Sequence, residues 1–119
     1  MIVDTQLSLV HFADEIFFRD HRLNYTPVNE SLAEVISCNE SRTFLRKIGI
    51  KGEIICTPSH SKDSISVILD TGDCIVGDLE PYEYISGYEN NLDLIKDWEK
   101  VMNYHPKRIL YAHTNEKVI

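Results

Sequence analysis

Three short runs rich in apolar and β-branched residues follow one another between Glu53 and Val76, and they constrain the fold more than any other feature of the chain. These runs are Glu53 to Thr57 (EIICT), Ser64 to Leu69 (SISVIL) and Cys74 to Val76 (CIV). Runs of this length bounded by polar turn residues are typical of strands. The sequence Asp70-Thr71-Gly72-Asp73 joins the last two runs and supplies the glycine of a hairpin turn. The segment is therefore expected to form a β-meander.

Helical periodicity flanks this meander on both sides. Between Asn39 and Ile48, apolar residues fall at helical spacing behind polar starters, and Gly49 stands where a glycine commonly ends a helix. From about Leu92 to Tyr104, apolar residues recur at steps of three and four until His105-Pro106 stops the pattern. Each segment is expected to form an amphipathic helix.

A last apolar run, Arg108 to Ala112 (RILYA), has the composition of a strand. The order helix, three strands, helix, strand predicts an α/β layer of the α+β type, in which a mainly antiparallel sheet carries helices on one face. The chain has 119 residues, of which 43% are hydrophobic and 26% charged. This profile is that of a globular domain, so residues 1–119 are expected to form a single domain.

The first 30 residues are harder to assign. Their apolar residues between Leu7 and Phe18 are interrupted by Asp14 and Glu15 and follow no clear period. Tyr25-Thr26-Pro27-Val28 is expected to be an extended loop, because proline disfavours helix at the residue before it.

Composition narrows the classes of partner. A net charge of −7 with scattered Lys and Arg offers no basic stripe, which argues against a nucleic-acid partner. No apolar run approaches the roughly 18 to 20 residues of a membrane span, and the acidic start does not resemble a secretion signal. We therefore expect a cytoplasmic protein with no membrane partner.

The three cysteines, Cys38, Cys56 and Cys74, are odd in number. Cys56 and Cys74 lie inside apolar strand-like runs, where a reduced thiol behaves as a small hydrophobe. Reduced, buried thiols are the favoured interpretation, and a disulfide or metal role is the alternative.

Metal-capable side chains follow three of the expected strands directly. His60 follows the run ending at Thr57, Asp78 follows Gly77 after the run ending at Val76, and His113 follows the run ending at Ala112. Because strand ends are where a rigid scaffold presents functional groups, these three side chains could converge at one edge of the sheet. Imidazole and carboxylate together suit zinc, iron or manganese. The alternative is that both histidines are ordinary loop residues and that Asp78 caps a turn.

The residues around these three positions strengthen the metal hypothesis. The segment Thr57-Pro58-Ser59-His60-Ser61-Lys62-Asp63-Ser64-Ile65 resembles the T-P-G-H-[ST]-x-[GD]-S-[IV] motif of the metallo-β-lactamase superfamily. Gly77-Asp78-Leu79 is similar to the G-D motif of that family, and Ile109-Leu110-Tyr111-Ala112-His113 is similar to its I-x-P-[GA]-H-G motif. All three occur in the family order, across about residues 47–116. Ser59, Tyr111 and Thr114 depart from the usual glycine, proline and glycine.

The resemblance implies half of an αββα sandwich in which one or two metals, zinc or else iron or manganese, activate a water for hydrolysis. By motif, His60 would ligate the first metal, Asp78 would bridge both metals and His113 would ligate the second. Both oxygens of a carboxylate carry lone pairs, so it can bridge.

The H-x-H-x-D-H motif, which supplies the remaining ligands in that family, is absent from this sequence. Asp20-His21 lacks the preceding His-x-His and is interpreted as a surface pair, and His11 and His105 are isolated. Since catalytic zinc usually has three protein ligands and a water, this chain is expected to hold metal weakly and to be inactive alone.

The chain is thus expected to be the carboxyl-terminal part of a metal-dependent hydrolase acting on an unidentified small-molecule substrate. Its expected partner is the missing amino-terminal half or a second copy in a homodimer, because half a sandwich leaves an apolar face uncovered. The alternative is a non-catalytic, degenerate domain that serves in self-association or weak ligand binding. A redox relative with a di-iron centre is a third class, which no residue here favours specifically. The loop from Glu80 to Asn91, with Tyr82, Tyr84 and Tyr88, could line a substrate pocket or pack over the sheet.

Overall fold

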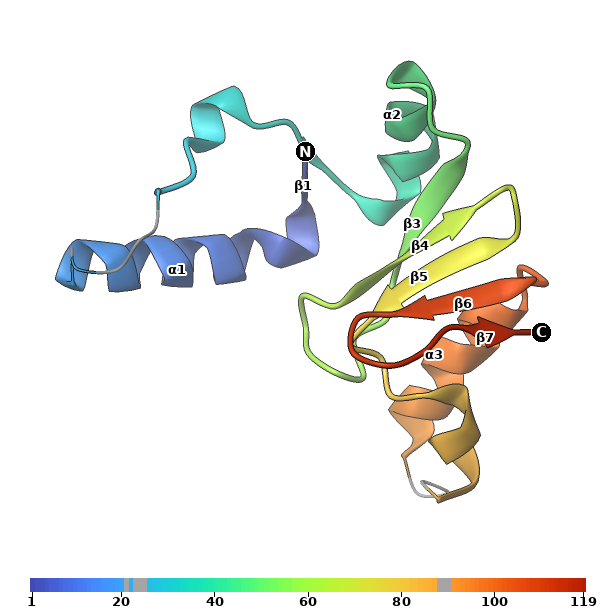
Figure 1. Cartoon of the computed structure of the whole chain (residues 1–119). Coiled ribbons are helices and arrows are strands. Elements are labelled where there is room, and N and C mark those ends of the chain that lie inside the picture. Colours follow the sequence, from blue (N-terminus) through green and yellow to red (C-terminus); the bar gives the residue numbers. More distant parts are fainter. Residues whose placement is uncertain (21, 23–25, 88–90) are drawn as a thin grey trace.

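The structure of the chain is a computed structural model that describes residues 1–20, 22, 26–87 and 91–119 (Figure 1). Its elements, in chain order, are β1 (Ile2–Val3), η1 (Asp4–Gln6), α1 (Leu7–Arg19), η2 (Glu30–Leu32), β2 (Val35–Ile36), η3 (Cys38–Glu40), α2 (Ser41–Lys47), β3 (Gly52–Cys56), β4 (Ile65–Leu69), β5 (Asp73–Gly77), η4 (Tyr82–Gly87), α3 (Leu92–Met102), β6 (Arg108–Tyr111) and β7 (Lys117–Val118).

A five-stranded sheet in the order β3-β4-β5-β6-β7 forms the centre of the molecule. Three of its four pairings are antiparallel, and only β5 and β6 run parallel, joined by a crossover through α3. A second sheet consists of β1 and β2 alone. The predicted α+β class with a mainly antiparallel sheet is confirmed.

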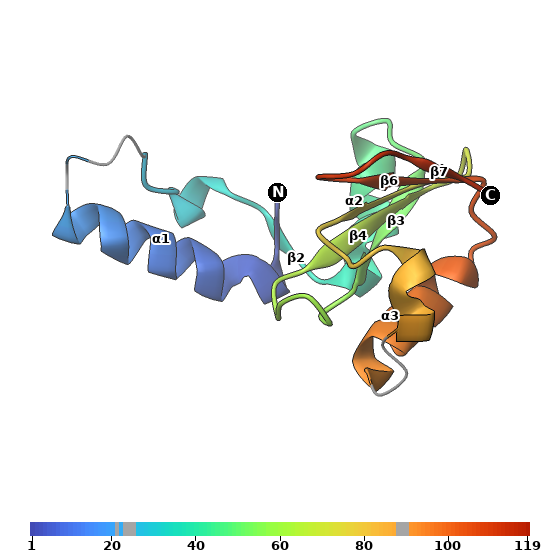
Figure 2. The same ribbon diagram turned by 60° about the horizontal axis from the view of Figure 1, so that its bottom comes forward.

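Strand alternation separates two hydrophobic clusters on opposite faces of this sheet. Ile68, Cys74 and Ile109 point to one face, where α3 covers them with Trp98 and other side chains that are almost wholly buried. Figure 2 shows α3 beneath the sheet. A helix with an apolar stripe is stabilised by burying that stripe, which explains why this segment folds as predicted.

The expectation of helices on one face holds for α3 and not for α2. Leu45 of α2 packs with Val3 and Ile54, and Val67 lies against the same cluster. Because Ile54 and Val67 alternate with residues that face α3, this smaller cluster lies on the other face. The Ser41 hydroxyl accepts a hydrogen bond of 2.8 Å from the Ile54 N–H, so α2 also covers the outer edge of β3, which would otherwise expose unpaired backbone groups.

Helix α1 was not predicted, because Asp14 and Glu15 interrupt its apolar residues and no clear period was recognised in them. It spans 13 residues and none of them is buried. In Figures 1 and 2, α1 stands apart from the five-stranded sheet, and β1, which precedes it, pairs with β2. Among the described residues, α1 contributes no side chain to either hydrophobic cluster. Its exposed apolar side chains include Leu9, Phe12, Ile16 and Phe18.

The other boundaries agree with the sequence to within a few residues. Gly72 adopts φ +100° in the turn between β4 and β5, a conformation that glycine reaches without strain. Thr26 to Val28 has no regular structure, as predicted, and Tyr25 lies outside the described residues. None of the helices in the described parts of the chain is both long and apolar enough to cross a bilayer.

Candidate metal site at the carboxyl ends of three strands

The sheet topology brings the three predicted site residues to one edge. Strand β4 is antiparallel to both β3 and β5, and β6 is parallel to β5. Strands β3, β5 and β6 therefore end at the same edge of the sheet, and His60, Asp78 and His113 follow these three ends in turn. The predicted convergence at this edge has a simple topological cause.

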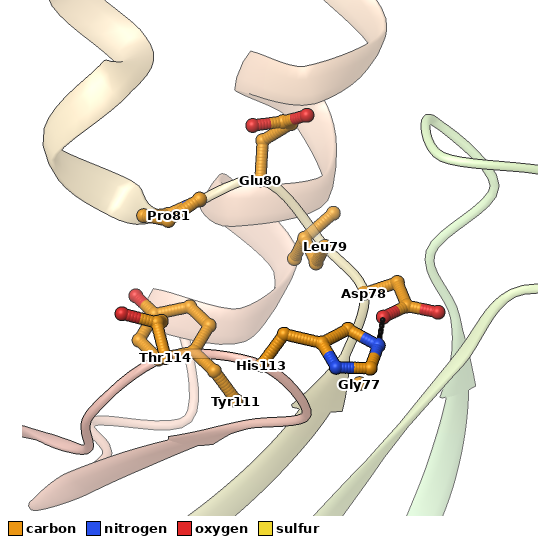
Figure 3. Close-up of a pocket in the computed structure, with 8 residues that line it drawn as sticks. All are labelled: Gly77, Asp78, Leu79, Glu80, Pro81, Tyr111, His113 and Thr114. Carbon is orange, nitrogen blue, oxygen red and sulfur yellow. Dashed lines mark ion pairs between the residues drawn. The ribbon is translucent and has the colours of Figure 1, made fainter.

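The carboxylate of Asp78 lies between the two imidazoles. Its Oδ1 is 3.0 Å from Nε2 of His113, and its Oδ2 is 4.0 Å from Nε2 of His60. Figure 3 shows the His113 ring directed at the carboxylate of Asp78. About half of the Asp78 and His60 side chains and 85% of the His113 side chain are exposed to solvent. Each carboxylate oxygen thus faces a different imidazole in a solvent-exposed setting.

Gly77 directs the chain at the point where Asp78 leaves the sheet. It has φ +60° and lies at an irregularity in the pairing of β5 with β6. Such a positive φ favours glycine over residues with a side chain. The Gly77 carbonyl accepts a hydrogen bond of 2.9 Å from the Ala112 N–H, which ties the residue before Asp78 to the residue before His113.

A small pocket of about 140 Å³ opens beside this pair. Its walls come from the chain after β5 and from the end of β6 (Figure 3), and its lining residues are Gly77, Asp78, Leu79, Glu80, Pro81, Tyr111, His113 and Thr114. Leu79 and Tyr111 provide apolar surface next to the polar Asp78 and His113. His60 stands outside this pocket, on the other oxygen of Asp78.

The loop that carries His60 is anchored from beneath by a buried carboxylate of α3. Asp97 is 2% exposed, and its Oδ2 accepts a hydrogen bond of 2.8 Å from the Ser59 N–H. Lys100 donates to Oδ1 of Asp97 and to the carbonyl of Cys56, both at 2.9 Å. A charge this deeply buried requires such partners. Asp97 therefore fixes the backbone directly before His60.

A second contact holds the beginning of the same loop. The hydroxyls of Thr57 and Ser66 are both fully buried and lie 2.9 Å apart in a hydrogen bond between β3 and β4. The Ser59 hydroxyl is also buried, but it has no hydrogen-bond partner among the described residues. The loop before His60 is thus firmly attached at its backbone and carries one unsatisfied side chain.

The chain after Asp78 is anchored by aromatic residues. Trp98 donates a hydrogen bond of 2.9 Å from Nε1 to the carbonyl of Glu80. The rings of Tyr82 and Tyr111 both lie against Trp98, with centroids 5.4 and 6.2 Å from it. Burial raises the pKa of the Tyr111 hydroxyl, which accepts a hydrogen bond from the Tyr82 N–H. Tyr82 therefore packs against Trp98 of α3, a position that neither predicted alternative named. Tyr84 is exposed, and Tyr88 lies outside the described residues.

The remaining histidines lie elsewhere. His11 pairs with Glu30 beside α1, and His105 follows the end of α3 with φ 54°. Asp20 forms an ion pair with Arg22, whose guanidinium lowers the pKa of the Asp20 carboxyl. His21 lies outside the described residues.

The ligand set at the strand ends is incomplete within the described chain. Among residues 1–20, 22, 26–87 and 91–119, no three or more His, Cys, Asp or Glu side chains form a group that could hold a metal ion. His60, Asp78 and His113 meet through the two oxygens of one carboxylate, so the described residues give two separate contacts and no closed site.

Asp97 is the residue of this region that sequence reasoning missed. It lies on the buried side of α3 with Leu94, Trp98 and Val101, and an acidic residue within an apolar helical stripe is the signal that could have identified it. Its partner Ser59 is 38 residues away in sequence, and no local pattern could have named that partner.

Comparisons of the chain with protein families, with curated proteins and with solved structures found no match.

Proposed function

We propose that the carboxyl ends of β3, β5 and β6 form part of the metal centre of a metal-dependent hydrolase similar to the metallo-β-lactamase superfamily. The observation that carries this proposal is the placement of Asp78 between His60 and His113, one imidazole on each carboxylate oxygen. Three motifs that are widely separated in sequence thereby supply neighbouring oxygen and nitrogen donors at one sheet edge.

The donor set fits a transition metal in kind. Histidine nitrogen and carboxylate oxygen are ordinary ligands of zinc, with bonds of about 2.0 to 2.2 Å. The carboxylate of Asp78 supplies one oxygen beside each imidazole, Oδ1 beside His113 and Oδ2 beside His60. A metal bound there would supply Lewis acidity, which lowers the pKa of a bound water and polarises the bond to be cleaved.

The number of ligands is too small for a complete site, because each side of Asp78 offers only one imidazole nitrogen and one carboxylate oxygen. Catalytic zinc usually takes three protein ligands, so further ligands must come from outside this set. The chain would then bind metal weakly and would not hydrolyse substrates by itself. This chain would contribute one part of the site, in which Gly77 positions Asp78 and Asp97 positions the loop of His60.

A cobalt titration tests the proposal, since Co²⁺ reports nitrogen and oxygen ligands by its visible spectrum. The chain is titrated with Co²⁺ and, by calorimetry, with Zn²⁺, alongside Asp78→Asn and His113→Gln. The matched control is His11→Gln, which changes an exposed histidine within α1 and leaves the strand ends intact. We expect binding in the micromolar to millimolar range for the wild type and the control, and at least about tenfold weaker binding for the two site variants.

Equal affinity for wild type, Asp78→Asn and His113→Gln would refute the proposed site. Circular dichroism and thermal melts must show that all variants fold, because a variant that unfolds would lose affinity for a different reason. Loss of binding in His11→Gln alone would assign metal binding to the region of α1.

A second candidate function, self-association without catalysis, is favoured by α1. The side chains of Leu9, Phe12 and Ile16 lie at helical spacing and are 37 to 59% exposed, and a contiguous apolar helix face of this kind is typical of an interface. Sedimentation velocity of the wild type and of Phe12→Glu tests this candidate, with Ser8→Glu as a control that adds the same charge to the same helix. A monomer at high concentration for the wild type would rule it out.

A further inference from the structure

Cys38 and Cys56 lie against each other at the point where η3 meets the end of β3. Their Sγ atoms are 2.7 Å apart, and a disulfide needs about 2.05 Å. Both cysteines are only partly buried, whereas Cys74 is fully buried within β5. The two sulfurs are thus close enough to bond and open enough for a small reagent to reach.

We propose that Cys38 and Cys56 form a dithiol site that reacts with low-molecular-weight disulfides such as oxidised glutathione and closes to an intramolecular disulfide. The inference rests on the contact between the two sulfurs and is independent of the proposed metal centre. Cys38 begins η3 and Cys56 ends β3, so the bond would join two elements that already pack together.

The electrostatic setting distinguishes the two thiols. Burial, together with the neighbouring Cys56, raises the pKa of the Cys38 thiol to about 12. Cys38 therefore remains protonated at neutral pH, and the thiolate is the nucleophile in disulfide exchange. We therefore assign the first attack to Cys56, whose Sγ lies beside that of Cys38 at the partly buried end of β3.

The reaction proceeds in two exchanges. The Cys56 thiolate attacks one sulfur of the small disulfide, a mixed disulfide forms and one small thiolate leaves. Cys38 then loses its proton and attacks the sulfur of Cys56, which releases the second small thiolate. Two protein thiols are oxidised to one disulfide, one small disulfide is reduced to two thiols, and the two protons pass to the released thiolates. Because Cys38 must ionise in the second exchange, ring closure is expected to accelerate as the pH rises towards 9.

The folded state should favour this disulfide strongly. A disulfide that closes a loop of about 18 residues restricts the unfolded chain, and by linkage the fold favours the bond by the same free energy. In the chain-entropy model this amounts to about a hundredfold larger oxidation equilibrium constant in the native protein than in the chain unfolded by urea.

Redox titration of the full chain tests the proposal. The protein is equilibrated with mixtures of oxidised and reduced glutathione, with and without 8 M urea (roughly the concentration needed to unfold a domain of this size), then quenched with acid, alkylated and mapped by mass spectrometry. We expect a native Cys38–Cys56 link that persists when the squared concentration of reduced glutathione, divided by the concentration of oxidised glutathione, is about a hundredfold higher than in urea, because each link formed releases two reduced molecules. Cys38→Ser should stop at the mixed disulfide on Cys56, and Cys74→Ala should leave the link unchanged.

Two results would overturn the proposal. One is a native protein that stays fully reduced, or carries only mixed disulfides, at ratios where the urea-unfolded chain is oxidised. The other is a native link that involves Cys74. Circular dichroism of each variant shows whether the fold is retained, and the comparison of native with unfolded wild type stands even where a variant does not fold.

Discussion

The buried carboxylate of Asp97 offers the sharpest test of how this chain holds the loop of His60. Replacement of Asp97 by asparagine preserves the shape of the side chain and one acceptor oxygen while removing its charge. The oxygen can still accept from the Ser59 N–H, but the amide nitrogen cannot accept from Lys100. The charged bond to Ser59 becomes a neutral one, and the ion pair with Lys100 is lost.

The magnitude follows from the two contacts. A hydrogen bond to a charged group contributes about 1.5 to 3 kcal/mol and a neutral one about 0.5 to 1.5 kcal/mol. The ion pair between Asp97 and Lys100 contributes little to the stability of the fold by itself, because the side chain of Lys100 is 47% exposed. We expect Asp97→Asn to cost about 1 to 2 kcal/mol. Asp97→Ala, which also leaves the Ser59 N–H unpaired and opens a cavity, should cost about 3 kcal/mol or more.

Thermal unfolding and hydrogen exchange together measure this effect. For a chain of this length, 1 kcal/mol corresponds to about 4 °C in Tm, so the asparagine variant should melt about 4 to 8 °C lower. The Ser59 amide should exchange faster as well, because its acceptor is weaker. Glu99→Gln, which changes an exposed carboxylate on the same helix, is the control and should move Tm by less than about 2 °C. An unchanged Tm and an unchanged Ser59 exchange rate in Asp97→Asn would refute the anchoring role.

Three further changes test other contacts. Ser59→Ala should raise the free energy of unfolding by about 1 kcal/mol, because the Ser59 hydroxyl is buried without a partner among the described residues; urea unfolding measures it, and a loss of stability would mean that the hydroxyl has a partner. Trp98→Phe should cost about 2 kcal/mol through the lost bond to the Glu80 carbonyl and the smaller ring, in contrast with little change for Tyr82→Phe. The Arg108 guanidinium lowers the pKa of Asp73 below its ordinary 3.8. A lowered folded-state pKa gives stability that is present above that ordinary value and lost as the pH falls through the folded pKa. The difference in stability between wild type and Asp73→Asn should therefore hold at neutral pH and shrink towards zero below about pH 4, and a difference independent of pH would exclude the ion pair as its cause.

Local sequence patterns were sufficient to predict the strands of the central sheet and the helix that buries one face against it. The strands at 53–57, 64–69 and 108–112 and the helix from Leu92 were predicted to within a few residues, since their apolar residues repeat with the period of the structure. Helix α1 has no buried residue, and Asp14 and Glu15 interrupt its apolar residues, so the helical spacing of Leu9, Phe12 and Ile16 was not recognised. The two-residue strands β1, β2 and β7 were missed for a related reason, because their pairing depends on distant partners rather than on local composition.

The candidate site and the two thiols show the same contrast between what local sequence predicts and what tertiary structure decides. The sequence by itself predicted His60, Asp78 and His113 as site residues, because each is a polar residue that follows an apolar strand and each lies in a motif. Only the tertiary structure decided how they meet, since the direction of β3, β5 and β6 brings their ends to one edge and orients each oxygen of Asp78 to a different imidazole. Asp97 beneath Ser59 and Cys38 beside Cys56 are contacts across 38 and 18 residues. Packing creates such contacts, and local composition and periodicity carry no record of them.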